Sequence, residues 1–206
     1  ESAKLSAQQA FYDIAKASAI DVNDQNQKCF SKQYNGGNII QFTDSCRPAT
    51  ETVKKMFASE YEKNMKNFVS SYPEGKPMEM NSALEENTIS TSAKTGFSAI
   101  QKSAYAEYSL SGDFYEKITV DLAEERIALG DFAEIYSESI DAVNACKNEG
   151  DMKSCIEGKI TMDRWDAAAT PESGWVLLEF STKKRFFFDE NGEKFGKITA
   201  KCGISL

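Results

Sequence analysis

Cysteine is the residue type that most constrains the fold of this chain, because each disulfide fixes which segments meet. Cys146 and Cys155 flank the sequence Asn148-Glu149-Gly150-Asp151, which is typical of a helix end followed by a new helix start. Each cysteine lies about one helical turn from this break. A helical hairpin would place the two sulfur atoms side by side, so the spacing predicts a Cys146–Cys155 disulfide.

The other three cysteines are more widely spaced. Cys29 and Cys46 bracket a polar loop containing Asn35-Gly36-Gly37, which favours a hairpin turn closed by a second disulfide. Cys202 is then left over, because five cysteines cannot all pair within one chain. Spacing alone leaves open the alternative of five reduced, buried thiols in a cytosolic protein.

Two disulfides favour an oxidising compartment. The sequence begins with Glu1 rather than Met, which fits a mature chain from which a signal peptide or membrane anchor has been removed. It contains no Asn-x-Ser/Thr site for glycosylation, which favours a bacterial protein. No apolar run approaches the roughly 20 residues that a membrane span needs. We therefore expect a periplasmic or extracellular protein without a transmembrane segment in this chain.

The chain contains no histidine, which excludes a Ser-His-Asp triad, a Cys-His pair and histidine-based zinc sites within it. No nucleotide-binding or metal-binding motif is present either, so we expect neither a cofactor nor a metal. A hydrolase that uses two carboxylates stays open, with Glu124 and Glu125 as examples of candidate residues. The sequence thus favours a non-catalytic role and leaves an enzyme open.

Apolar residues recur with helical spacing over much of the chain before residue 170. Pro48 suits the first turn of a long helix, and Asp131 with Glu134 resembles a capping box. The expected helices cover 5–20, 48–72, 95–108, 115–129, 131–143 and a segment from Met152 onward.

The periodicity changes after Pro171. Val176, Leu178 and Phe180 alternate with their neighbours, as do Phe186 with Phe188 and the even residues from 198 to 204. Asn191-Gly192 is typical of a two-residue hairpin turn. The sequence therefore predicts an α+β protein: one domain over residues 1–206, mainly helical over about 1–170, with a three-stranded antiparallel meander over about 174–205.

Two groups of residues are candidate partner surfaces. Glu134, Glu138 and Asp141 follow one side of a predicted helix, in a segment (107–149) with eleven acidic and three basic residues. Such a face favours a basic partner, a loosely bound cation or plain solvation, and it disfavours binding to nucleic acid. Trp175, Leu177 and Phe187 would lie on the second face of the meander, where either a helix or a protein partner covers them.

The segment Gln101–Tyr108, with the sequence QKSAYAEY, resembles the helix end of type IV pilin ectodomains. An amphipathic first helix, a late antiparallel meander and a cysteine near the end are similar to that family's outline. The similar residues lie about a hundred positions later than in the family. The sequence also predicts more helices in the middle of the chain than an ordinary pilin has. The resemblance implies an assembly subunit whose apolar spine precedes the first helix.

By elimination, the sequence favours a secreted or periplasmic, disulfide-stapled factor that binds a protein partner, such as an inhibitor, an immunity protein or an accessory surface protein. A pilin-like subunit and a carboxylate-pair hydrolase are the alternatives.

Overall fold

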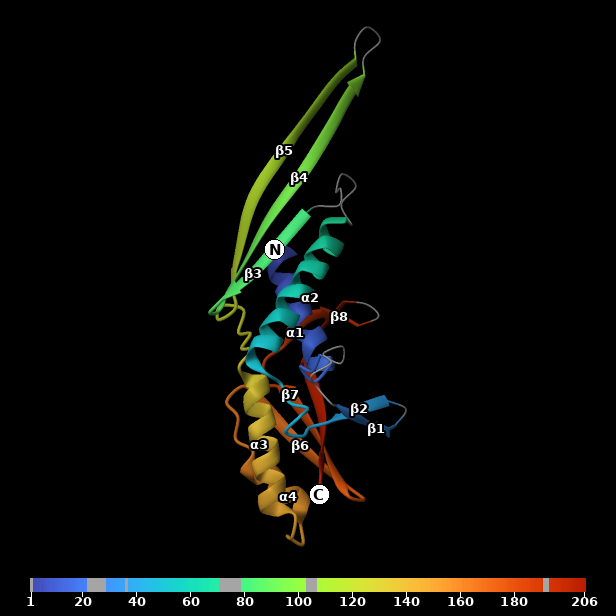
Figure 1. The fold of residues 1–206 in the computed structure, drawn as a ribbon, viewed down its shortest axis with the longest axis vertical. Coiled ribbons are helices and arrows are strands. Elements are labelled where there is room, and N and C mark those ends of the chain that lie inside the picture. Colours follow the sequence, from blue (N-terminus) through green and yellow to red (C-terminus); the bar gives the residue numbers. More distant parts are fainter. Residues whose placement is uncertain (1, 22–28, 36, 71–78, 103–106, 191–192) are drawn as a thin grey trace. The chain divides into compact units, whose positions relative to one another are not determined.

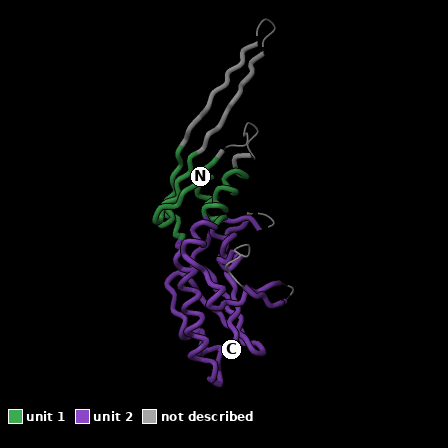
Figure 2. The backbone as a smooth tube through the Cα atoms, in the orientation of Figure 1, with its two compact units in different colours: residues 1–10, 58–127 green, residues 11–57, 128–206 purple. Residues whose placement is uncertain are grey.

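A computed structural model of the chain describes residues 2–21, 29–35, 37–70, 79–102, 107–190 and 193–206 (Figure 1). Contacts within the chain divide it into two compact units, shown in Figure 2: unit 1 comprises residues 1–10 and 58–127, and unit 2 comprises residues 11–57 and 128–206. The helices are α1 Ser2–Lys16, α2 Thr50–Ser70, α3 Asp131–Cys146 and α4 Met152–Lys159. The strands are β1 Phe30–Tyr34, β2 Gly37–Gln41, β3 Glu79–Glu85, β4 Thr88–Lys102, β5 Glu107–Asp121, β6 Trp165–Glu172, β7 Trp175–Thr182, β8 Phe186–Asp189, β9 Glu193–Gly196 and β10 Thr199–Ser205. The single-domain organisation expected from the sequence stays a prediction.

The protein is α+β, but the expectation of a mainly helical first two-thirds is wrong. The segment 95–108 belongs to β4 and β5, apart from residues 103–106, which lie outside the described residues. The segment 115–129 continues β5 to Asp121 and then forms turns. Helical spacing of a few apolar residues is also compatible with strands, and the Ser, Thr and aromatic residues here favour the strand. The helix end on which the pilin resemblance rested is therefore strand on both sides of residues 103–106.

Unit 1 contains a three-stranded antiparallel sheet in the order β3-β4-β5. β4 pairs with β5 along its whole length, from Thr88↔Asp121 to Lys102↔Glu107. β3 pairs only with the first half of β4, ending at Glu79↔Lys94. Among the described strands, the distal part of the β4–β5 ribbon thus has no third strand.

Unit 2 contains a five-stranded sheet in the order β1-β2-β10-β7-β6. Residues alternate across β7 and β10 as the sequence predicts: Val176, Leu178 and Phe180 are buried on one face, and Ala200 and Cys202 lie beside them. α3 covers this face with Phe132 and Ile135 (Figure 1). Phe11 joins the same core, packing on the rings of Phe132, Trp165 and Phe186 at 5.6–6.0 Å.

The pairing within the expected meander differs. β8 pairs with β9 in a separate two-stranded sheet, whereas β10 pairs directly with β7, from Thr199↔Ser181 to Ser205↔Trp175. The chain leaves β7 at Thr182 and returns at Ile198, where two hydrogen bonds join these residues. The β8–β9 hairpin is therefore an insertion between two neighbouring strands. β6, whose Ala-rich sequence gives no strand pattern, occupies the position beside β7.

Asp131 does not cap α3 as the capping-box pattern predicts. Gly130 is the N-cap and provides no side-chain cap, while the buried Asp131 carboxylate binds Arg164 and accepts a hydrogen bond of 2.8 Å from Trp165 Nε1. The charge of this buried carboxylate is thus paired with the partly exposed guanidinium of Arg164. These contacts fix the start of α3 against the start of β6.

Both predicted disulfides are confirmed. Cys146 and Cys155 join α3 to α4, and Cys29 and Cys46 close the segment that contains β1 and β2. Asp151 caps α4 by accepting a hydrogen bond from the Ser154 amide at 3.1 Å, as the helix-start pattern predicts.

Candidate functional site

The acidic residues predicted to share one side of a helix do so on α3. Glu134 and Asp141 are exposed and Glu138 is half-buried, while Phe132 and Ile135 on the opposite side are buried. The row is solvated in the structure, and its binding to a basic partner stays a prediction.

Trp175 and Leu177 lie on the second face of the sheet, as the alternation predicts, but they are buried at 7% and 1% exposure. Among the described residues, those that pack against them come from β1 and β2. Ile39 of β2 packs against both, and Tyr34 of β1 meets the Trp175 ring edge-on at 6.0 Å. The β1–β2 hairpin is therefore their cover, and these two residues lie inside the protein rather than on a partner surface.

The β1–β2 hairpin is joined to the main sheet by few backbone contacts. Its register with β10 is a single pair, Gly203↔Gln41, supported by a hydrogen bond from the Phe42 amide to the Gly203 carbonyl at 2.8 Å. The Gln41 side chain lies so close to Gly203 that a Cβ there would sit 1.8 Å from Nε2. Lys32 adds a cation–π contact, 5.1 Å from the Trp175 ring centre. The Cys29–Cys46 disulfide closes the base of the hairpin covalently.

Phe187 lies apart from Trp175 and Leu177, on β8. It is 51% exposed, directly opposite Phe195 of β9, which is 55% exposed. The two ring centres are 4.6 Å apart. We call these two residues the aromatic pair. Burying exposed apolar side chains against a partner is favourable. Two large exposed rings in direct contact therefore mark a candidate binding surface.

The hairpin that carries the aromatic pair is firmly anchored. On its other side, Phe188 stacks on Tyr12 of α1 with ring centres 4.4 Å apart, and Phe186 packs on Phe11 at 5.6 Å. The aromatic pair is thus presented on a backbone whose position is fixed by buried rings, which reduces the entropy cost of binding.

Glu190, next to β8, strengthens this anchor. Its carboxylate lies 2.9 Å from Lys194 Nζ and 3.6 Å from Lys16 Nζ of α1. The Tyr12 hydroxyl and Lys194 hold the negative charge, which lowers the pKa of Glu190 to about 2. This carboxylate therefore stays ionised throughout the ordinary pH range and joins the hairpin to α1.

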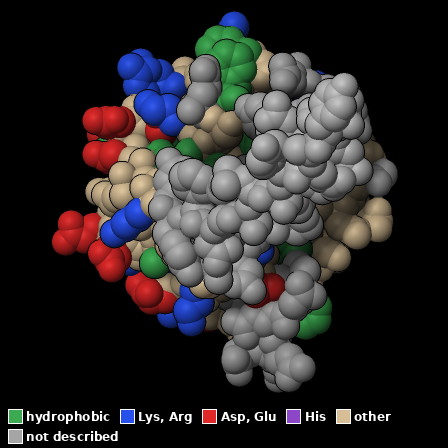
Figure 3. Space-filling model, turned by 90° about the horizontal axis from the view of Figure 1, so that it is seen from above, with side chains coloured by type: hydrophobic (Ala, Val, Ile, Leu, Met, Phe, Trp, Pro, Cys, Tyr) green, Lys and Arg blue, Asp and Glu red, His purple; other side chains and the backbone are tan. Residues whose placement is uncertain are grey.

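The second face of the sheet is open beside the buried Trp175 cluster. There the side chains of β6, β7 and β10 line a shallow polar groove of about 400 Å³. Its charges are internally neutralised, since Lys197 binds Asp166 at 2.8 Å and Lys201 binds Glu179. Acidic and basic side chains also alternate on the described surface seen in Figure 3. The groove therefore offers no net charge to a ligand.

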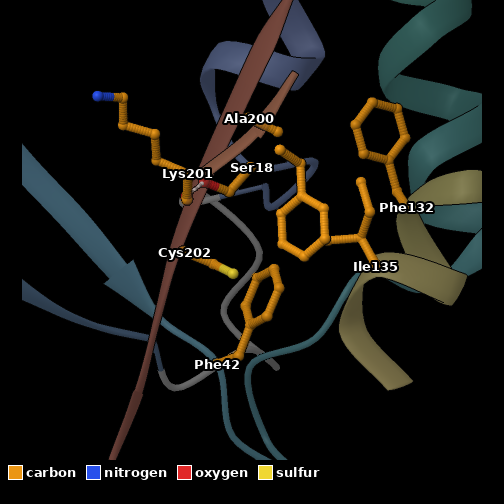
Figure 4. A pocket seen from close by; sticks show the side chains of 8 residues that line it. Ser18, Phe42, Phe132, Ile135, Ala200, Lys201 and Cys202 are labelled. Atoms are coloured by element: carbon orange, nitrogen blue, oxygen red, sulfur yellow. Dashed lines mark hydrogen bonds between the residues drawn. The ribbon is translucent and has the colours of Figure 1, made fainter. Parts of the chain in front are cut away.

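The free Cys202 lies in an apolar crevice with Phe42, Phe132 and Ile135 around it (Figure 4). The space between these side chains does not admit a water molecule. Burial raises the pKa of the Cys202 thiol to about 12, and Ser139 Oγ lies 3.9 Å from the sulfur. A protonated, enclosed thiol is unreactive, so this cysteine has a packing role.

The candidate carboxylates Glu124 and Glu125 lie in unit 1, in the turn after β5. Glu125 binds Lys4 Nζ at 2.7 Å and accepts a hydrogen bond of 2.9 Å from Gln8. Both partners come from α1, so Glu125 has a structural role as a link between α1 and this turn. The use of a carboxylate pair in catalysis stays untested.

The sequence identifies Phe187 of the aromatic pair but does not identify Phe195. A two-residue turn at Asn191-Gly192 would place Phe195 opposite Phe188, on the buried side. The structure instead pairs Asp189 with Glu193, which leaves three residues between the strands and places Phe195 opposite Phe187. A shift of one residue moves a side chain to the other face of a sheet. Asn191 and Gly192 themselves lie outside the described residues.

No family model matches the chain, and no curated protein or solved structure is measurably similar to it. Among the described helices, none is long and apolar enough to cross a membrane. Within the same described residues, no three acidic or cysteine side chains gather closely enough to hold a metal ion.

Proposed function

We propose that this chain is an exported, disulfide-stapled factor that binds another protein without catalysing a reaction, and that the aromatic pair on β8–β9 is the centre of its binding surface. The observation that carries the proposal is two large apolar side chains, each about half exposed, in contact on a rigidly anchored hairpin.

The chemistry of the surface supports a protein as the ligand. Aromatic residues and arginine are enriched at the centres of protein interfaces. Arg185 is exposed directly before β8. Burying the exposed halves of Phe187 and Phe195 would contribute about 1 kcal/mol each.

Two disulfides support export, because such bonds persist in oxidising compartments and are reduced in the cytosol. The periplasm and the extracellular space are both compatible with them. Mapping peptides without reduction, after alkylating free thiols, tests this part. Protein from the native source should yield both disulfides and one buried free thiol, whereas five alkylated cysteines would contradict export.

The binding surface is tested by affinity capture from the extracellular or periplasmic fraction of the source organism. Immobilised wild-type protein is compared with F187S/F195S and with Phe30→Ser. Phe30 is a matched control because it is exposed at 69% on another hairpin. A partner retained by wild type and by the control but lost with F187S/F195S supports the proposal. Equal retention by all three would reject the aromatic pair as the binding surface.

A further inference from the structure

We propose that the outward face of the β8–β9 hairpin is a two-fold interface between two copies of this chain. The inference rests on the proposed function, since it names the partner of the same aromatic pair. It predicts a symmetric dimer in which the aromatic pairs of both copies meet.

The charge order along β8 carries the proposal. Arg185, Phe187 and Asp189 are exposed, whereas Phe186 and Phe188 between them are buried. On the outward face, the exposed Arg185 directly before β8 is thus followed by Phe187 and then by the acidic Asp189, with Phe195 beside Phe187 in the middle. We call Arg185, Phe187, Phe195 and Asp189 the polar-ended strip.

Such a strip is complementary to itself when it is turned around. A two-fold axis through the aromatic pair places Arg185 of one copy opposite Asp189 of the other, and the same contact forms again by symmetry. The aromatic rings meet at the centre, where water is excluded. An antiparallel arrangement is therefore attractive at all three positions, whereas a parallel one would place like charges together.

The net charge of −8 does not prevent this contact. Charges separated by more than about 8 Å are largely screened at physiological ionic strength. Repulsion between copies thus comes mainly from charges near the strip, and there the two ends carry opposite signs.

The size of the strip sets the strength of the dimer. Strands of four residues, Phe186–Asp189 and Glu193–Gly196, are about 13 Å long. Such a face buries far less than the roughly 800 Å² per partner of a stable interface. We therefore expect a reversible dimer that forms at roughly 0.1–1 mM and falls apart on dilution, as weak contacts of this size do.

Sedimentation velocity of the intact, oxidised protein tests the proposal over concentrations from about 10 μM to 1 mM. Wild type should shift from monomer towards dimer. F187S/F195S should weaken dimerisation by about tenfold or more, because it removes the centre of the interface. Arg185→Asp and Asp189→Arg should each weaken it about threefold to tenfold, because each places like charges opposite one another.

The decisive variant carries both reversals in one chain. R185D/D189R exchanges the two ends of the strip, so the same two-fold arrangement again pairs opposite charges. It should dimerise within about threefold of wild type, since both charge pairs are restored. Lys147→Asp, an exposed charge reversal in the turn after α3, should leave the dimer unchanged, and far-ultraviolet circular dichroism should be unaltered in every variant.

A wild-type protein that stays monomeric at 1 mM, or a double reversal as weak as the single ones, would overturn the two-fold interface. If the affinity capture still finds a partner that depends on Phe187 and Phe195, only this inference falls. If both experiments fail, the proposed function falls with it.

Discussion

Unit 2 contains two hairpins, β1–β2 and β8–β9, which have the same secondary structure but different roles. β1–β2 turns Ile39 and Tyr34 inward over Trp175 and Leu177, and a disulfide closes its base. β8–β9 has no disulfide between its described residues, and buried rings on one side hold it while Phe187 and Phe195 face solvent. The comparison indicates that the first hairpin covers a core and the second presents a surface.

The largest expected effect is a difference in stability between variants on the two sides of β8. Phe188→Ala removes the ring that stacks on Tyr12 and should lower the free energy of unfolding by about 3 kcal/mol. Phe187→Ala on the exposed side should cost less than about 1 kcal/mol. Urea unfolding of the two variants measures the difference, and equal losses would show that both sides of β8 are part of the core.

Removing the Cys29–Cys46 disulfide should destabilise the β1–β2 hairpin selectively. The bond closes a loop with a sequence separation of 17, for which loop entropy gives about 3 kcal/mol. In C29S/C46S, hydrogen exchange should therefore accelerate in β1 and β2, while the amides of β8 and β9 keep their protection. Loss of protection in both hairpins would contradict the view that they are anchored independently.

Gly203→Ala tests the single pair that joins β1–β2 to the sheet. A Cβ at this position would lie 1.8 Å from Gln41 Nε2 and 2.9 Å from Trp175 Cε3, so the cover must shift. We expect a loss of about 1–3 kcal/mol, as for other overpacked cores.

Gln41→Ala provides the matched rescue for that variant. The Gln41 amide is buried and has no hydrogen-bond partner among the described residues, so its removal is inexpensive. G203A/Q41A should therefore recover part of the thermal stability lost in Gly203→Ala. If G203A/Q41A is no more stable than Gly203→Ala, the loss of stability does not come from the contact with Gln41.

The smallest expected effect is the pH dependence of stability that comes from Glu190, next to the β8–β9 hairpin. The pKa of Glu190 is about 2 in the fold, below the ordinary value of 4.5, so ionisation of this group stabilises the protein. Its contribution is complete above about pH 4.5 and is lost as the pH falls through 2. The carboxylate is 37% exposed, so the effect is modest. The difference in melting temperature between wild type and Glu190→Gln should shrink between pH 5 and pH 2, and a constant difference would contradict this ion pair.

The sequence identifies the elements whose patterns are strong and local. Cysteine spacing predicts both disulfides, and alternation predicts the buried side of β7 and β10. Periodicity fails where tertiary pairing decides the structure: the residues 95–102 and 107–108 carry helical spacing but belong to strands, because β4 and β5 satisfy each other's backbone groups. The Ala-rich β6 has no strand pattern of its own, and it pairs with β7 along its whole length.

The candidate surface was only partly predictable for a similar reason. Phe187 is identified by its alternation with Phe186 and Phe188, but its grouping with Trp175 and Leu177 assumed that β7 and β8 pair. Because β8 pairs with β9 instead, Phe187 is separated from that cluster and joined to Phe195. The register that brings these rings together depends on one residue in the connection, which no composition or periodicity specifies.

Photo-crosslinking at the two hairpins tests whether β8–β9 presents a binding surface and β1–β2 does not. Benzoylphenylalanine replaces either Phe187 or Phe30, and the oxidised protein is irradiated in the exported fraction of its source organism. We expect a discrete protein adduct from position 187, identified by mass spectrometry as a second copy or a foreign chain, and none from position 30. Adducts at equal yield from both positions, or from position 30 alone, would contradict a presenting role for β8–β9.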